Sequence, residues 1–252
     1  APPFELIEVD ADRQLVLACD HARNRVPHSL GDLGLNAAEL EEHIAWDIGA
    51  GAVTRRLSKH LQADAVLGGY SRLVVDLNRD LDDPTAFPRV SDGVLVPGNL
   101  SLSVEHKAER ARVLFKPYHE ALRRSIQKRT KGQRTPVMIC IHSFTPVQNN
   151  VARPWHVGIL WDKDSRLALP LIAALNARGD LVVGDNEPYS GRHPADYTVD
   201  HHAEVLGLAY AAIEIRQDLV TDESGQRRWA DLLADVLQPL LRDDDLYRPA
   251  GS

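Results

Sequence analysis

The chain has 252 residues, 44% of them hydrophobic, which is enough to bury the sizeable core of one α/β domain. Its formal net charge of -7 argues against a nucleic-acid-binding surface, because such a surface needs clustered basic residues. The sequence has no leader pattern and no run near the ~20 apolar residues of a membrane span, so we expect a cytoplasmic protein without membrane partners. Its two cysteines lie singly in apolar runs, and we expect them to be reduced.

The first half of the chain alternates apolar runs with helical patterns. We expect strands at 15–19, 65–67 and 72–77, and helices at 37–43 and from Trp46 to about 61. The stretch 80–100 is rich in Asp, Pro and Gly and predicts a long irregular loop. Because loops longer than about 12–15 residues are usually functional, we expect this loop to cover a site like a lid.

The second half continues the same alternation. Helical spacing predicts one long helix over 103–131, with a bend at Pro117. Further strands are expected at 137–141, 156–162, 181–185 and 211–216, and further helices at 167–179, 200–207 and 226–242. Strands that alternate with helices favour a three-layer α/β/α sandwich with a mixed, mostly parallel sheet, here as a single domain over 1–252.

Polar residues follow four of the apolar runs. The runs lead into Asp20-His21, Asp76 to Arg79, His142, and Glu214 to Arg216. In open α/β sheets the ligand crevice lies beyond the carboxyl ends of the strands, so we expect these polar residues to meet in one site.

Two histidines at separate strand ends, His21 and His142, indicate a zinc site. Catalytic zinc commonly takes three protein ligands and leaves one position open, and the third ligand here should be a carboxylate. Asp47 in the WDIGA motif is the preferred candidate, with Asp20 and the amide of Asn24 as weaker ones. The alternatives are that Asp47 caps a helix and that the histidines are structural.

Glu214 lies between Ile213 and Ile215, at the dry end of a strand. Burial raises the pKa of a carboxylate, which suits Glu214 to act as a general base toward an attacking water. It could instead pair with Arg216, two residues further on the same strand face. Arg216 is also a candidate for substrate binding.

Arg72, Asn78 and Arg79 form a candidate clamp for an acidic substrate, because guanidinium groups match carboxylates with two hydrogen bonds. The alternative is that the arginines pair with the nearby aspartates 76, 80, 82 and 83. His202, in the pair His201-His202, is a further candidate for contact with the substrate.

Seven motifs, in one order, resemble the N-formylglutamate amidohydrolase family over about residues 15–220. They are CDHARNRVP (19–27), WDIGA (46–50), SRLVVDLNR (71–79), IHSF (141–144), DNEPYS (185–190), HHAEVLGL (201–208) and IEIRQDL (213–219). More distantly the chain resembles the zinc carboxypeptidases and acyl-amino-acid deacylases, which implies a zinc-exopeptidase-like fold and one Zn2+ ion. Those enzymes have, in chain order, a first zinc histidine, an Asn-Arg pair that binds the substrate carboxylate, a second zinc histidine and a glutamate that acts as base. His21, Asn78-Arg79, His142 and Glu214 match these roles in that order.

The resemblance implies a zinc-dependent hydrolase that converts N-formyl-L-glutamate and water to formate and glutamate. The carboxypeptidase relatives use His-x-x-Glu, whereas Asn24 stands three residues after His21, so the carboxylate ligand comes from elsewhere and we predict Asp47. The first motif also differs from the Pro-His-Ser-Gly form of the histidine-degrading members. Another N-acyl amino acid or a cell-wall fragment therefore stays open as substrate, as does a metal-free protein that binds acidic metabolites. The sequence leaves open whether the protein is a monomer or a homo-oligomer.

Overall fold

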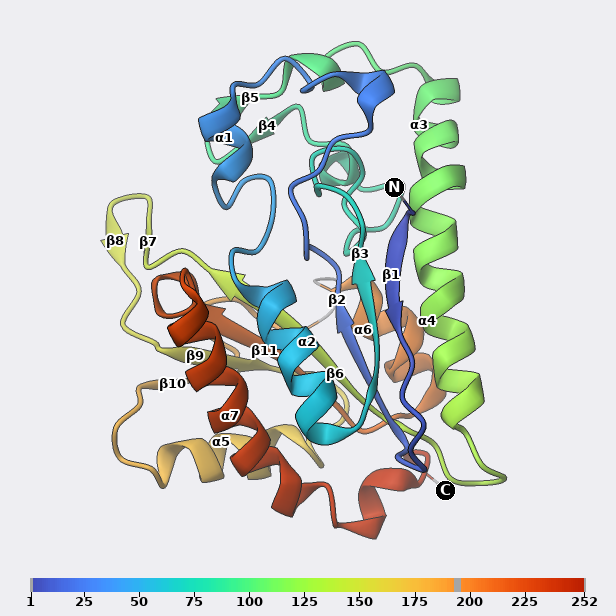
Figure 1. Cartoon of the computed structure of the whole chain (residues 1–252), viewed down its shortest axis with the longest axis vertical. Coiled ribbons are helices and arrows are strands. Elements are labelled where there is room, and N and C mark those ends of the chain that lie inside the picture. Colours follow the sequence, from blue (N-terminus) through green and yellow to red (C-terminus); the bar gives the residue numbers. More distant parts are fainter. Residues whose placement is uncertain (1, 193–195, 252) are drawn as a thin grey trace.

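A seven-stranded sheet forms the centre of the computed structural model, which describes residues 2–192 and 196–251 (Figure 1). The strands lie in the order β1 (Phe4–Ile7), β3 (Asp64–Gly68), β2 (Leu15–Cys19), β6 (Val137–Phe144), β11 (Tyr210–Arg216), β9 (Val157–Leu160) and β10 (Val183–Asp185). The central strands β3, β2, β6 and β11 are parallel, while β1 and β9 pair antiparallel with β3 and β11. The sheet is therefore mixed and mostly parallel, as the sequence predicts.

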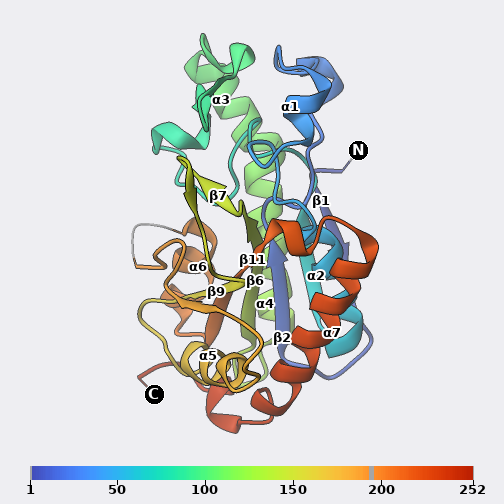
Figure 2. The ribbon, with the colours of Figure 1, turned by 90° about the vertical axis from the view of Figure 1, so that its left-hand side faces the viewer.

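Helices cover both faces of this sheet. They are α1 (Ala37–Glu41), α2 (Ala50–Leu61), α3 (Val104–Arg110), α4 (Lys116–Arg129), α5 (Ala168–Asn176), α6 (Tyr197–His202) and α7 (Glu223–Leu240). Figure 2 shows β2, β6 and β11 between α6 on one side and α2 and α7 on the other. The predicted three-layer α/β/α architecture is confirmed.

The strands are apolar at every position because helices cover the sheet on both faces. In β2, Leu15, Leu17 and Cys19 point into the core beneath α2, α5 and α7, whereas Val16 and Ala18 point into the core beneath α4 and α6. Successive strand residues face opposite sides of a sheet, so a strand covered on both sides needs an apolar residue at every position.

Short elements complete the chain. Two hairpins are formed by β4 (Val90–Ser91) with β5 (Val94–Leu95) and by β7 (Val147–Gln148) with β8 (Val151–Ala152). Single turns of 3-10 helix lie at His28–Leu30, Pro84–Ala86, Pro97–Asn99, Glu204–Leu206, Gln217–Leu219 and Asp244–Tyr247. The stretch 80–100 is thus irregular apart from β4, β5 and two 3-10 turns, as predicted.

The long helix predicted over 103–131 is divided by a π-helical turn, Ala111–Phe115, between α3 and α4. Pro117 follows this turn and has no N–H to donate, and its ring crowds the carbonyl one turn before it. The wider π turn accommodates that ring, so the irregularity precedes the proline.

The prediction of a strand at 72–77 is wrong, because these residues form turns instead. The run Leu73 to Val75 is buried, but side chains rather than a neighbouring strand satisfy its carbonyls. Asn99 donates to the carbonyl of Leu73 at 2.8 Å, and Arg110 donates to that of Val74 at 2.9 Å. Such distant partners satisfy buried backbone groups as well as a strand would, and no local pattern reveals them.

The helix predicted from Trp46 begins four residues later, at Ala50. Gly49 precedes it with a φ of 81°, a backbone conformation that favours glycine, and a Cβ at Gly49 would lie 2.2 Å from the carbonyl oxygen of Val220. Asp47 therefore lies in the loop before α2 and not at a helix cap.

Two further helix starts lie earlier than predicted, because Asp residues cap them. Asp196 accepts from the N–H of Val199 at the start of α6, and Asp222 accepts from the N–H of Gly225 at the start of α7. No helix within residues 2–192 and 196–251 is both long and apolar enough to cross a membrane.

Candidate active site

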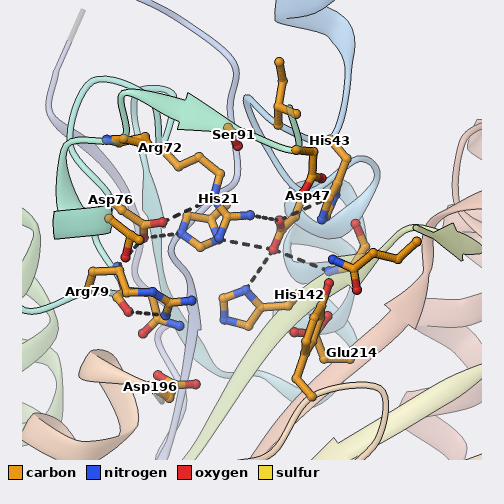
Figure 3. Close-up of a pocket in the computed structure, with 18 of the residues that line it drawn as sticks. His21, His43, Asp47, Arg72, Asp76, Arg79, Ser91, His142, Asp196 and Glu214 are labelled. Atoms are coloured by element: carbon orange, nitrogen blue, oxygen red, sulfur yellow. Dashed lines mark hydrogen bonds and ion pairs between the residues drawn. The ribbon is translucent and has the colours of Figure 1, made fainter. Parts of the chain in front are cut away.

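A cavity of about 680 Å³ lies at the carboxyl edge of the sheet (Figure 3). Its wall comes from the turn after β2, the loop before α2, the turns at 72–79, the ends of β6 and β11, and the loop after β10. Thr85, Pro88 and Val90 to Asp92 of the irregular 80–100 stretch also contribute to the wall. His142 and Glu214 lie within β6 and β11 and not beyond them, because both strands continue two residues further.

His21, Asp47 and His142 converge in this cavity. Their ligand atoms all lie within 4.8 Å of one another, and all three residues are buried. The Nδ1 atoms of His21 and His142 lie 3.4 and 2.8 Å from Oδ2 of Asp47 (Figure 3). The backbone holds the loop in place, since the N–H of Asp47 donates to the carbonyl of His21 at 2.9 Å.

The charges of this cluster depend on one another. Burial raises the pKa of Asp47, but His21 and His142 outweigh burial and hold the pKa well below its usual range. Burial likewise opposes protonation of His142, but Asp20 and Asp47 raise the pKa of this imidazole well above its usual value. Two imidazoles and one carboxylate in a buried, converging arrangement are a donor set that suits zinc.

Arg72 pairs with carboxylates of the site. Its Nη1 donates to Oδ1 of Asp47 at 3.1 Å, and its Nε donates to Oδ2 of Asp76 at 3.3 Å. The sequence left open whether Arg72 binds the substrate or pairs with a nearby aspartate. In the structure Arg72 pairs with the nearby Asp76. Arg72 lines the cavity while it holds Asp47 and Asp76 in place.

Glu214 lies directly beside the histidine cluster. It pairs in register with His142 across β11 and β6, is 7% exposed, and its Oε2 has no hydrogen-bond partner within residues 2–192 and 196–251. Burial raises its pKa to about 7, a value that suits a group that accepts a proton near neutral pH. Arg216 does not pair with Glu214 but with Asp218, at 2.8 Å, and it is not part of the described cavity wall.

Asn78 and Arg79 line the opposite part of the wall. Oδ1 of Asn78 accepts from the backbone N–H of Thr198 at 2.9 Å, which orients the side-chain amide. The guanidinium of Arg79 donates to the carbonyl of Asn78 at 2.9 Å. These two residues therefore present nitrogen donors at one end of the cavity.

His202 lies behind this wall and not on it. It stacks on His119 with an angle of 13° between the rings, and its Nε2 lies 3.0 Å from Nδ1 of His119. His119 also contacts the carbonyl of Leu77 at 2.9 Å through Nε2. The two histidines thus form a buried pair under the segment that carries Asn78.

The sequence analysis gave no role in the site to His43, Tyr189 and Asp196, which line the cavity, and it named Asp76 only as a polar residue at a strand end and a possible partner of the arginines. Burial lowers the pKa of His43 to about 4 and raises that of Asp196 to about 6. Asp76 and Tyr189 lie within the motifs SRLVVDLNR and DNEPYS, and their place in these motifs could have indicated a role in the site. His43 precedes Asp47 by four residues in a loop, where periodicity carries no information.

A three-layer α/β/α fold with a buried His/Asp/His cluster beside a glutamate, at the carboxyl edge of the sheet, has the groups that a metal-dependent hydrolase needs. The chain belongs to the N-formylglutamate amidohydrolase family, whose family model matches residues 13–221. The resemblance inferred from the motifs is thereby confirmed.

Two solved structures share this fold. The gene product Atu2144 from Agrobacterium tumefaciens is 36% identical, covers 96% of both chains and superposes with a TM-score of 0.92. An N-formylglutamate amidohydrolase from Ralstonia eutropha JMP134 is 17% identical over 97% of this chain and 99% of its own, with a TM-score of 0.68, and it supports the fold. No curated protein matches the sequence.

Proposed function

We propose that the protein is a zinc-dependent amidohydrolase that cleaves the N-acyl amide bond of an acidic N-acyl amino acid. N-formyl-L-glutamate is the first candidate substrate, which water would convert to formate and glutamate. The convergence of His21, Asp47 and His142 beside the unpartnered carboxylate of Glu214 is the observation that carries this proposal. Membership of the N-formylglutamate amidohydrolase family supports the reaction type.

In this proposal His21, Asp47 and His142 hold one zinc ion. When bound, zinc supplies a Lewis acid that polarises the scissile carbonyl and lowers the pKa of water from 15.7 to about 7. The loop before α2 and the two strands β2 and β6 bring the three side chains together, so the sheet itself orients them.

Glu214 acts as the general base. Its carboxylate accepts a proton from the attacking water and returns it to the nitrogen of the leaving amino acid, which departs as the free amine. Burial raises the pKa of this carboxylate, which makes it a better proton acceptor than an exposed glutamate. Burial keeps bulk water from competing for this proton.

Asn78 and Arg79 bind the substrate carboxylate. The amide of Asn78 is oriented by Thr198, and the guanidinium of Arg79 can donate two parallel hydrogen bonds to one carboxylate. Arg72 acts differently, because it holds Asp47 and Asp76. We assign His202 and Arg216 no contact with the substrate, since neither lines the described cavity.

A related N-acyl amino acid with a single carboxylate is the second candidate substrate. Arg72 already pairs with two aspartates, and the carboxylates of Asp92 and Asp196 also line the cavity. A second substrate carboxylate would meet this negative charge, whereas a neutral side chain would not. These carboxylates are the observation that supports a less charged substrate as the second candidate.

Turnover of a substrate panel by zinc-loaded protein tests the proposal. The panel contains N-formyl-L-glutamate, N-formyl-L-glutamine, N-formyl-L-methionine and N-acetyl-L-glutamate, with release of the amino acid as the readout. Turnover of N-formyl-L-glutamate with the highest kcat/KM supports the first candidate, and preference for a neutral N-formyl amino acid supports the second. Failure to release an amino acid from any of the four contradicts the proposed reaction.

A further inference from the structure

We propose that Asp76 and Asp20 are positioning residues that make Nδ1 the metal-binding nitrogen of His21 and of His142. The inference rests on the zinc site proposed above and extends it to the two carboxylates behind the histidines. Each carboxylate lies at the nitrogen that faces away from Asp47.

Asp76 fixes the ring of His21. Its Oδ1 lies 2.7 Å from Nε2 of His21 and also accepts from the backbone N–H of Asn78 at 2.8 Å, while Arg72 donates to its Oδ2. A carboxylate held by a guanidinium only accepts hydrogen bonds, so Nε2 of His21 carries the hydrogen. In the neutral imidazole that a metal requires, the lone pair is therefore on Nδ1, which faces Asp47.

Asp20 faces Nε2 of His142 in a similar way, but at ion-pair distance and not as a hydrogen bond. The hydroxyls of Tyr118 and Thr198 donate to its Oδ1 at 2.8 and 2.6 Å, which leaves Oδ2 for another partner. Oδ2 lies 3.2 Å from Nε2 of His142, within ion-pair distance, and neither atom has a hydrogen-bond partner among the described residues. Asp20 is completely buried, so solvent offers no substitute.

The two histidines therefore present the same nitrogen to Asp47, although one comes from the turn after β2 and the other from β6. A histidine must offer an unprotonated nitrogen to a metal, and a carboxylate on the other nitrogen fixes both the tautomer and the ring orientation. Aspartates that only stabilised the fold would not both have to lie at Nε2. Loss of such a partner typically weakens metal affinity ~10–100-fold.

Substitution by asparagine separates this role from simple packing. In Asp20→Asn, the hydroxyls of Tyr118 and Thr198 keep the amide oxygen, so the NH2 group faces Nε2 of His142. An NH2 donor there favours the tautomer with hydrogen on Nδ1, which removes the metal-binding lone pair. In Asp76→Asn, the NH2 group cannot accept a hydrogen bond, so the side chain loses either the contact with Arg72, which holds the carboxylate in place, or both contacts with His21 and Asn78.

Asp64 offers a matched control. It is also completely buried and pairs with Arg129, whose Nε donates to its Oδ2 at 2.7 Å. Asp64 pairs in register with Val16 near the amino end of β2, whereas His21 follows the carboxyl end. Asp64→Asn thus removes a buried charge of the same kind at the opposite edge of the sheet.

The experiment measures the zinc Kd of chelator-stripped wild type and of the three variants by competition with a chromophoric chelator, and their thermal unfolding without metal. We expect the Kd to rise ~10–100-fold in Asp76→Asn and Asp20→Asn, and to stay within twofold in Asp64→Asn even where that variant unfolds at lower temperature. Thr198→Val removes one of the hydroxyls that orient Asp20 and should also raise the zinc Kd. This variant replaces Asp20→Asn in the experiment if Asp20→Asn does not fold.

Wild-type zinc affinity in Asp76→Asn and in a folded variant at or beside Asp20 would overturn the inference but leave the zinc site standing. A wild-type protein that does not bind zinc would instead overturn the proposed function, on which the inference depends. The two failures are therefore distinguishable.

Discussion

Glu214→Gln changes one oxygen of the buried carboxylate to an NH2 group and keeps the shape of the side chain. Since a glutamine cannot take a proton from water, we expect kcat to fall ~10²–10⁴-fold, the usual contribution of a general base. Glu214 is not among the converging ligand atoms, so the zinc Kd should stay within a few fold of the wild-type value.

The same substitution has a calculable effect on stability. Burial raises the pKa of Glu214 from 4.5 to about 7, so the folded chain holds a proton that the unfolded chain has released between these pH values. At about 1.4 kcal/mol per pKa unit, the ionised carboxylate costs the folded protein about 3 kcal/mol above pH 7. The cost vanishes below pH 4.5, where both states are protonated.

Metal-free Glu214→Gln should therefore be more stable than metal-free wild type at pH 8, by up to about 3 kcal/mol, and equally stable at pH 4. Urea unfolding at both pH values gives the difference, and steady-state kinetics of the zinc-loaded proteins gives the loss of kcat. A variant that is less stable than wild type at pH 8, or that keeps its kcat, would refute the assignment of Glu214 as a buried, unpaired base.

Two further predictions concern residues away from the proposed metal. Arg79→Lys removes the two-pronged contact to the substrate carboxylate and should raise KM ~10–100-fold with a smaller change in kcat, since a charged hydrogen bond contributes about 1.5–3 kcal/mol. Arg216→Lys is the matched control and should leave KM unchanged; the reverse result would place the clamp at Arg216. Burial lowers the pKa of His119 to about 3 and of His202 to about 4, so both stay neutral in the folded protein while the unfolded chain takes up protons. Stability should fall as pH drops from about 6.5 to about 4, by about 1.4 kcal/mol per pH unit for each such histidine, and His202→Gln should lower the slope measured in urea unfolding by about that amount. An unchanged slope would contradict the buried neutral pair.

The layers of the fold follow from local sequence patterns. An apolar residue at every position of 15–19 or 137–141 predicts a strand covered on both faces, and such strands place polar residues at the carboxyl edge of the sheet. His21, His142 and Glu214 could therefore be grouped from the sequence. The segment 72–77 could not be assigned, because its backbone partners are the distant side chains of Asn99 and Arg110.

The sequence could not predict which charged side chains pair with one another. Arg72 had four nearby aspartates to choose from, and its actual partners are Asp76 and the distant Asp47. Asp20 was considered as a metal ligand because it precedes His21, yet its carboxylate faces Nε2 of His142. Adjacent strand residues point to opposite faces, and which long-range partner each one meets depends on the packing of the whole sheet.

A zinc titration of chelator-stripped protein tests whether the protein acts through zinc held by His21, Asp47 and His142. We expect wild type to bind one zinc ion per chain and hydrolysis of the best panel substrate to rise in proportion to bound zinc. His142→Ala, folded by circular dichroism, should lose both. Full hydrolysis by zinc-free wild type, or zinc binding by His142→Ala with wild-type affinity, would contradict these expectations.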